Sequence, residues 1–369
     1  GVAGLDEAER AGIRARQLAE QLNDTEAFVD LCTFQGGMLM ANRVREKFES
    51  GFAIIEEGLG VAERAGLVVA AARASRSLAM GYFHDGRFDQ SERMIDQVIA
   101  DLARIDDPAR PSDLALGGYV MRDRLALYRD DTIAALDRAT ATYDTAVRVE
   151  NRTLQTVSAA TVAQAHLIRG EYEAAQHWVE KSLAVAVAIG NLGATRAAAA
   201  IGLIIGLQIG DAGPTTNRYR ELLDYGPSGN VEPIGSAVVL EALLAMDAIE
   251  QAEQLAEASY ASAGGRLRES LAALALGEVR VRAGGDRLKE ARGWFDRALR
   301  LADEIGTRSI GASAMVGLGE LAVARDDKAK AAEHFTEAAA IYRGLGLAHY
   351  VAHAERLLAS CTYDEQQSA

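Results

Sequence analysis

A pattern of residues that returns about every forty positions constrains the fold of this chain more than any other feature. It contains a glycine, an aromatic residue two positions later and a small residue three positions after that, and it closes on Ile-Gly or Leu-Gly. The clearest copy runs from Gly170 and Tyr172 through Ala175 to Gly190. The step from small residue to closing glycine recurs twice: 291–306 and 331–346. Self-similarity at a fixed period predicts a solenoid, in which each repeat packs on its neighbours.

The length and composition of the chain agree with such an array. The 369 residues exceed what one compact core usually holds, but a solenoid escapes that limit because its core is built repeat by repeat. Hydrophobic residues make up 49% and aromatic residues only 6%, which suits helices packed closely through small side chains. Only 5 prolines occur, as expected of a chain made of long helices, since proline removes a backbone donor and clashes with the preceding turn.

Breaks between the periodic runs divide the chain into predicted helix pairs. Asp85-Gly86, Arg169-Gly170 and Asp326-Asp327 stand at such breaks, where a tight turn between helices needs residues that tolerate left-handed backbone. A first helix over about 6–22, a last helix over about 347–360 and a polar tail flank the pairs. The predicted pairs span about 24–66, 67–106, 112–150, 151–190, 192–225, 231–264, 266–306 and 307–346.

One interruption divides the array into two predicted blocks. Pro214 enters the second helix of its pair early, and the richest turn cluster of the chain follows at 224–233. We therefore predict an N-terminal block over 1–226 and a C-terminal block over 227–369. The second block continues the first and ends in a capping helix.

Small and aromatic residues mark the predicted core. Ala175, Ala291 and Ala331 are expected where the two helices of a pair cross most closely. Trp178, Trp294, Phe295 and Phe335 follow within about one turn and are expected to fill the space between repeats, with direct contact to a ligand as the alternative.

These residues resemble the tetratricopeptide repeat. Gly170, Tyr172, Ala175 and Ser182 match its pattern, as do Gly86, Phe88 and Ser91 in an earlier unit. The longer repeat, closed by Ile-Gly or Leu-Gly, resembles the sensor arrays of large bacterial signalling ATPases, including maltose-activator-like transcriptional regulators and ATPase-coupled adenylate cyclases. The resemblance implies an all-α fold, a right-handed α-α superhelix of about eight to nine helical hairpins with end helices.

Charge and cysteine content limit the partners and the compartment. The net charge of -14 disfavours binding to nucleic acid or to an anionic membrane. The longest apolar stretch, 197–207, is too short to span a bilayer. Cys32 and Cys361 form no Cys-x-x-Cys unit, which predicts a reducing, cytoplasmic compartment.

The sequence offers little catalytic chemistry. It contains no phosphate-binding Gly-x-x-x-x-Gly-Lys motif, and Gly317 and Gly319 lie inside a predicted helix, where they would permit close packing. His349 and His353 share one helix face, a spacing that can bind zinc, but a solvated capping helix is the simpler interpretation. We therefore expect no catalytic residue, no cofactor and no metal.

The remaining candidate is the inner, concave surface, which the first helix of each pair is expected to line. On the register of the 151–190 unit, its partner-binding residues include Arg76, Met80, Phe83, Arg124 and Gln164. Tyr119 and Arg122 align with core positions, but an arginine is rarely buried without a partner, so we expect a local twist that adds them to the groove. Arginines on an acidic protein could hold a carboxylate or an acidic peptide. Alternatively, they pair with neighbouring acids such as Asp113 or Asp123.

The predicted function is recognition without catalysis. The chain would be a scaffold or sensor array that binds a peptide or protein segment on its concave face, within a bacterial signalling or transcriptional regulator. The alternative is a domain that senses a small effector and controls an attached ATPase, cyclase or DNA-binding module. The end helices could also stack into a homodimer.

Overall fold

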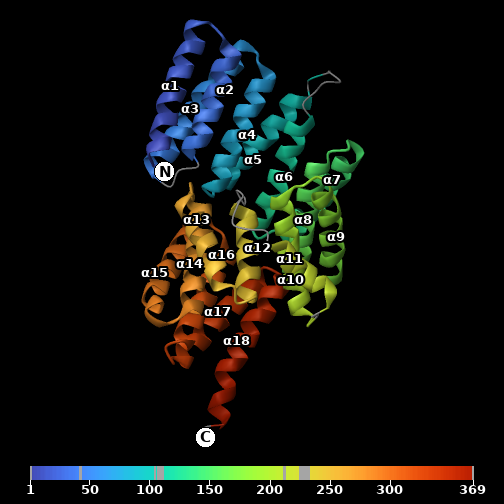
Figure 1. The fold of residues 1–369 in the computed structure, drawn as a ribbon, viewed down its shortest axis with the longest axis vertical. Coiled ribbons are helices and arrows are strands. Elements are labelled where there is room, and N and C mark those ends of the chain that lie inside the picture. The colour runs from blue at the N-terminus through green and yellow to red at the C-terminus, as the bar shows by residue number, and fades with distance from the viewer. Residues whose placement is uncertain are drawn as a thin grey trace. The chain divides into compact units, whose positions relative to one another are not determined.

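The computed structural model describes residues 2–40, 44–103, 105, 112–210, 213–223 and 233–367, and within these ranges the regular elements are all helical (Figure 1). The first ten helices are α1 (Val2–Gln21), α2 (Thr25–Met40), α3 (Arg45–Ala65), α4 (Val68–His84), α5 (Phe88–Ala103), α6 (Ser112–Tyr128), α7 (Thr132–Arg148), α8 (Arg152–Ile168), α9 (Tyr172–Ala188) and α10 (Leu192–Gln208). The others are α11 (Pro214–Leu223), α12 (Pro233–Ala245), α13 (Ile249–Ala261), α14 (Arg266–Ala283), the short 3₁₀ helix η1 (Gly285–Arg287), α15 (Leu288–Ile305), α16 (Arg308–Val323), α17 (Lys328–Gly344) and α18 (Ala348–Gln367). The predicted all-α class and the pairing of consecutive helices are confirmed.

The chain forms two compact units. Unit 1 comprises residues 1–122 with 262–266, and unit 2 comprises residues 123–261 with 267–369. The turn cluster around residues 226 and 227, where the sequence analysis divides the chain, lies outside the described residues, so that division stays a prediction.

Short turns with left-handed residues separate the helices. Gly170 has a φ of 76°, and its backbone N–H donates to the Leu167 carbonyl of α8 at 2.8 Å. Asp326 adopts a φ of 62° between α16 and α17, and the Asp327 side chain accepts a hydrogen bond from the Lys330 N–H. These turns occupy the breaks that the sequence predicts, because glycine and aspartate tolerate this backbone conformation.

The small residues of the repeat lie where helices cross. Ala175, Ala291 and Ala331 are fully buried, as are Phe295 and Phe335, so these predicted core positions are confirmed. Trp178 and Trp294 differ from the prediction, because each is only partly buried and packs at the border of the core. The Trp178 ring meets Tyr143 edge-on at 5.0 Å, and the Lys181 ammonium lies over it at 4.1 Å. The polar edge of an indole is accommodated more easily at such a border than in a dry core.

Helix α18 corrects the prediction of a solvated capping helix. His349 is 5% exposed, and Ala354 and Cys361 are also buried. The helix packs on α17, its neighbour in sequence, and also contacts α8, which lies far earlier in the chain. Its apolar and histidine positions share one face, so burying that face is favourable although the opposite face carries charges such as Glu355.

Contacts between distant helices close unit 2 on itself. The Thr307 hydroxyl donates to the Tyr128 carbonyl at 3.1 Å. The Asp130 carboxylate accepts hydrogen bonds from the backbone N–H groups of Arg308 and Ser309, at the start of α16. The last repeats of unit 2 therefore contact its first helices.

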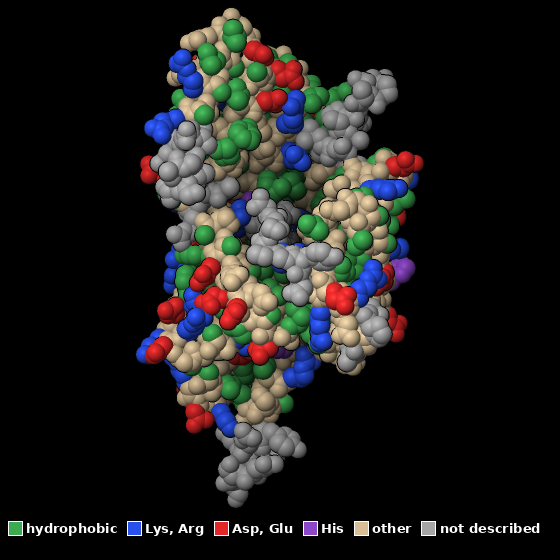
Figure 2. All heavy atoms as spheres, viewed as in Figure 1, with side chains coloured by type: hydrophobic (Ala, Val, Ile, Leu, Met, Phe, Trp, Pro, Cys, Tyr) green, Lys and Arg blue, Asp and Glu red, His purple; other side chains and the backbone are tan. Residues whose placement is uncertain are grey.

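The described surface mixes charges of both signs. On the face drawn in Figure 2, acidic and basic side chains alternate without a continuous basic patch over the described residues. Both cysteines are buried as free thiols. No described helix combines the length and the apolar character needed to cross a membrane.

Candidate functional site

A cavity of about 390 Å³ lies inside unit 2. Its walls come mainly from the first helix of successive pairs, α8, α10, α12, α14 and α16, together with α18 and the end of α6. The sequence analysis assigned the inner surface to these first helices, and in unit 2 they line the cavity. Much of the wall is apolar: Ile168, Ile204, Val238, Leu240, Leu244, Ile310 and Val316.

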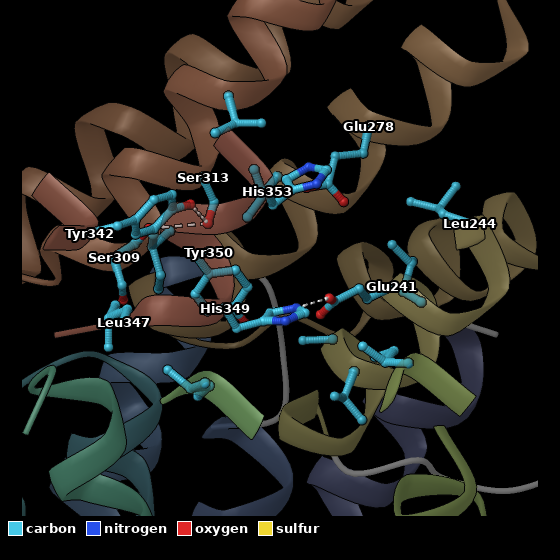
Figure 3. Close-up of a pocket in the computed structure, with 18 of the residues that line it drawn as sticks. Glu241, Leu244, Glu278, Ser309, Ser313, Tyr342, Leu347, His349, Tyr350 and His353 are labelled. Carbon is cyan, nitrogen blue, oxygen red and sulfur yellow. Dashed lines mark hydrogen bonds and ion pairs between the residues drawn. The ribbon is translucent and has the colours of Figure 1, made fainter. Parts of the chain in front are cut away.

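Three glutamates from three consecutive first helices contribute an acidic wall. Glu241 comes from α12, Glu278 from α14 and Glu320 from α16. Glu320 forms an ion pair with Arg282 at 3.7 Å. Glu278 makes no hydrogen bond or ion pair with any residue that the structure describes, and it points into the cavity (Figure 3). We call Glu241, Glu278 and Glu320 the acidic wall.

Burial determines the protonation of this wall. Loss of hydration, with the nearby charges of Glu320 and Glu241, raises the pKa of Glu278 to about 8. Burial also raises the pKa of Glu320, although Arg282 opposes the shift. At neutral pH the Glu278 carboxyl is therefore mostly protonated, because no opposite charge compensates its ionised form.

Two histidines of α18 face the acidic wall. His349 Nε2 lies 3.6 Å from Glu241 Oε1, and His349 Nδ1 lies 3.2 Å from the Tyr172 hydroxyl. His353 lies beside Glu278 in Figure 3, and burial is the main cause of its lowered pKa. Two histidines one turn apart, His349 buried and His353 half-buried, thus face the acidic wall.

A pair of tyrosines forms another side of the cavity. The rings of Tyr342 and Tyr350 stack with centroids 5.3 Å apart and an interplanar angle of 30°. The Tyr342 hydroxyl shares a hydrogen bond of 2.7 Å with the Ser313 hydroxyl (Figure 3). Burial raises the pKa of both phenols, so they stay neutral and present aromatic faces and hydroxyl groups.

Metal binding has no support in the described part of the chain. No three histidine, cysteine, aspartate or glutamate side chains there are grouped as metal ligands. His349 and His353, whose spacing could suit zinc, instead face Glu241 and Glu278. The cavity combines carboxyl, imidazole and hydroxyl groups with apolar side chains. Sites that bind small ligands have this mixed composition.

The predicted groove residues of unit 1 are Arg76, Met80, Phe83, Tyr119 and Arg122. Arg76 is exposed and forms no hydrogen bond or ion pair with the residues that the structure describes, and Met80 is half-buried. Phe83 is only 2% exposed, so its placement on the groove surface is corrected: its ring lies in the core near Phe88. The Arg122 guanidinium lies over the Tyr119 ring at 5.2 Å and 3.8 Å from Asp96. Arg122 therefore pairs with a neighbouring acid, the alternative that the sequence left open.

The other two predicted groove residues belong to unit 2. Arg124 is half-buried in α6, and Gln164 of α8 lines the cavity. The structure thus brings one of the seven predicted residues, Gln164, to the cavity wall.

Sequence reasoning missed the acidic wall, although a signal was present. Each of its glutamates is a lone acid within an apolar stretch: Glu241 in 237–245, Glu278 in 271–279 and Glu320 in 314–324. Leu-Gly precedes both Glu278 and Glu320, so these two occupy the same register in successive repeats. A repeated charge on the apolar side of a first helix indicates a polar site inside the array, because ionisable side chains are rarely buried without a partner.

Comparison with known proteins supports the fold. Residues 269–344 match the family model of the tetratricopeptide repeat, a stretch that contains Glu278 and Glu320. Curated protein sequences give no significant match.

Several solved structures align with the chain at low sequence identity. A Rap protein complexed with competence and sporulation factor aligns at 13% identity and a TM-score of 0.46, over 100% of this chain and 99% of that one. Yeast Tom70 aligns at 14% identity and a TM-score of 0.44, over 89% of this chain and 64% of that one. A signal-transduction ATPase with a tetratricopeptide-repeat sensor from Pyrococcus horikoshii aligns at 12% identity and a TM-score of 0.41. The alignment covers 95% of this chain and 55% of that one. These likenesses concern the helical fold alone.

Proposed function

We propose that the chain is a recognition protein and that the cavity of unit 2 holds part of a short peptide segment. The observation that carries this proposal is a partly open cavity of about 390 Å³ with apolar, aromatic and carboxyl groups on its walls. A cavity of this size falls in the range of small-ligand sites. It accommodates a few side chains of an extended segment, whereas a folded domain is too large to enter.

The repeat itself supports a binding role without catalysis. The family match covers α14 to α17, which supply Glu278, Glu320 and Tyr342 to the cavity. Helical repeats present extended inner surfaces for binding. We place this recognition in a cytoplasmic, bacterial signalling or transcriptional regulator, on the sequence resemblance and on the free thiols.

A small effector is the second candidate occupant. The volume of the cavity favours it, because about 390 Å³ lies in the range of small-ligand sites, and His349 and Tyr350 of α18 add polar and aromatic groups to its wall. In that case, occupancy of the cavity would control an attached ATPase, cyclase or DNA-binding module.

The arginine surface predicted from the sequence remains a separate proposal for an acidic partner. Arg76 supports it best, since its side chain is exposed beside Met80. Arg122 contributes less, because Asp96 and Tyr119 already engage its guanidinium.

The test of the cavity is retention of peptides by the intact chain. The purified protein is mixed with a pool of randomised pentapeptides, and the retained peptides are identified by mass spectrometry after gel filtration. Ala245 lines the cavity at the end of α12 and is exposed, so A245W places an indole at the cavity without overpacking the core. We expect A245W to reduce retention at least tenfold.

The matched control is A340W, because Ala340 is exposed on α17 and does not line the cavity. We expect A340W to retain peptides as the parent chain does. Equal retention by the parent chain and A245W, with both folded by circular dichroism, would show that peptides do not bind in this cavity.

A further inference from the structure

We propose that the acidic wall of this cavity binds a cationic group, an ammonium or a guanidinium, supplied by a basic residue of the bound segment. This inference rests on the proposed function of the same cavity and names the chemistry of its ligand.

The balance of charges around the cavity favours a cationic ligand. Four carboxyl groups line it: Asp130, Glu241, Glu278 and Glu320. The permanent cations among its lining residues are Arg282 and Arg356. Arg282 pairs with Glu320, and Arg356 donates a hydrogen bond to Gln208 at 3.2 Å. The carboxyl groups therefore outnumber the fixed positive charges.

Glu278 is the member of the acidic wall that lacks a partner. Glu241 faces His349 and Glu320 faces Arg282, but the Glu278 carboxyl has no hydrogen bond or ion pair among the described residues. The Glu278 side chain is half-buried, and its carboxyl faces the cavity (Figure 3). An ionised carboxylate in such surroundings is unfavourable without a counter-charge. A bound cation supplies that counter-charge, whereas without one the carboxyl keeps its proton.

The geometry of the cavity allows one ligand to reach the whole wall. Glu241, Glu278 and Glu320 line the same cavity from three consecutive first helices. The stacked rings of Tyr342 and Tyr350 also line the cavity, and aromatic faces attract cations. A guanidinium has five donors in a planar fork, so it can bind more than one carboxylate at once. An anionic ligand would instead meet repulsion from the same wall.

The first experiment compares arginine with citrulline, which has nearly the same shape without the charge. Two pentapeptide pools carry arginine or citrulline at the central position, with the other positions randomised. We expect the parent chain to retain the arginine pool at least tenfold better. In E278Q, which keeps the shape of the side chain, this preference falls severalfold.

A matched variant controls for the change in net charge. Glu337 is exposed on α17 and lies outside the cavity, so E337Q removes the same charge without touching the acidic wall. We expect E337Q to keep the full preference for arginine. A preference lost equally in E337Q and E278Q would attribute it to net charge and overturn the proposal.

The second experiment uses n-butylguanidinium and its neutral analogue n-pentanol, measured by calorimetry on the intact chain. Binding of n-butylguanidinium is expected to strengthen severalfold between pH 6 and pH 8.5, because Glu278 loses its proton in that range, and E278Q removes most of this rise. The ionisable and charged groups that face the same cavity are Asp130, Glu241, Arg282, Glu320, Tyr342, His349, Tyr350, His353 and Arg356. The histidines also become more neutral with rising pH, so the part of the rise that survives in E278Q reports their contribution.

The outcomes separate this inference from the proposed function. If peptides bind in the cavity without any preference for arginine, the proposal of a cationic ligand is wrong, whereas the proposal of peptide binding is supported. Binding of n-butylguanidinium that A245W abolishes, with no peptide retained, overturns peptide binding and assigns the cavity to a free cationic effector. Failure of both probes to bind overturns both proposals.

Discussion

At the scale of single residues, Glu278 shows how a repeat array can hide an ionisable group. Its neighbours in sequence are apolar, and the helix places it on the side that faces the cavity. The same helix position in the following repeat carries Glu320. Burial of two carboxyl groups in one cavity costs free energy unless protons or cations neutralise them. The presence of both groups in this cavity therefore indicates what charge a ligand would carry.

The raised pKa of Glu278 predicts how stability depends on pH. The folded chain holds this proton up to about pH 8, whereas the unfolded chain releases it near the ordinary value of 4.5. Since the folded state binds more protons in this window, stability is full below about pH 4.5 and falls as the pH rises toward 8. The free energy of unfolding of E278Q should therefore fall less over this range than that of the parent chain, by on the order of 2–4 kcal/mol. Chemical denaturation at pH 5 and pH 9 measures the difference.

The E337Q variant is again the control for this measurement, because Glu337 is exposed. Its stability should follow the parent chain at both pH values. Parallel stability curves for the parent and E278Q would mean that Glu278 is ionised in the folded protein at pH 7.

At the scale of helices, glycines determine how closely first and second helices pack. The Phe295 ring of α15 lies against Gly277 of α14 and Gly317 of α16. A Cβ atom on Gly317 would lie 2.2 Å from this ring, and one on Gly319 would lie 2.4 Å from the ring of Phe335. The sequence prediction that Gly317 and Gly319 permit close packing is confirmed.

Substitution of Gly317 should therefore destabilise the array. G317A forces the buried Phe295 ring to move, and we expect a loss of about 1–3 kcal/mol. The control is G293A in α15, where an added Cβ meets no atom within 4 Å. Because alanine favours helix more than glycine does, G293A should stabilise the chain by about 0.5–1 kcal/mol. Urea denaturation of the two variants checks the opposite signs, and a destabilised G293A would contradict the packing described here.

At the scale of the whole molecule, the closure of unit 2 changes how its stability is distributed. In a linear solenoid each repeat depends on its neighbours alone. In unit 2, Asp130 at the end of α6 accepts hydrogen bonds from Arg308 and Ser309 at the start of α16. Tyr172 and His349 form a second contact across a similar separation in sequence. Early and late helices of this unit therefore support each other directly.

A glycine substitution at Asp130 isolates this long-range contact. Asp130 and Asp326 both adopt a φ of 62°, so glycine relieves the same backbone strain at either position. Only Asp130 accepts hydrogen bonds from a distant helix start, whereas Asp326 is exposed. D130G should be about 1 kcal/mol less stable than D326G, as for the loss of a helix cap.

Hydrogen exchange gives the second readout of this prediction. D130G should speed the exchange of the first amides of α16, which lie far along the chain from the substitution. Unchanged exchange there, with a stability equal to that of D326G, would show that Asp130 does not hold α16 in solution.

The helices and their turns could be predicted from the sequence because they depend on local physics. Gly170 and Asp326 have the backbone freedom that a turn requires, and Ala291 and Phe295 recur at the spacing of a packed helix pair. The groove residues were less predictable. Transferring the register from one repeat placed Phe83 on the surface, but it is buried, because small rotations of a helix decide which side chain faces inward.

The sequence by itself determined that the chain is an array of paired helices, because periodic apolar residues and turn residues act within one repeat or between neighbours. Only the tertiary structure decided where the array closes, since the contacts of α18 and Asp130 join residues far apart in the chain. Those contacts bring Glu278, His349 and His353 together around one cavity. The electrostatics of the candidate site follow from this arrangement, because the free energy of a carboxylate depends on the water and charges around it.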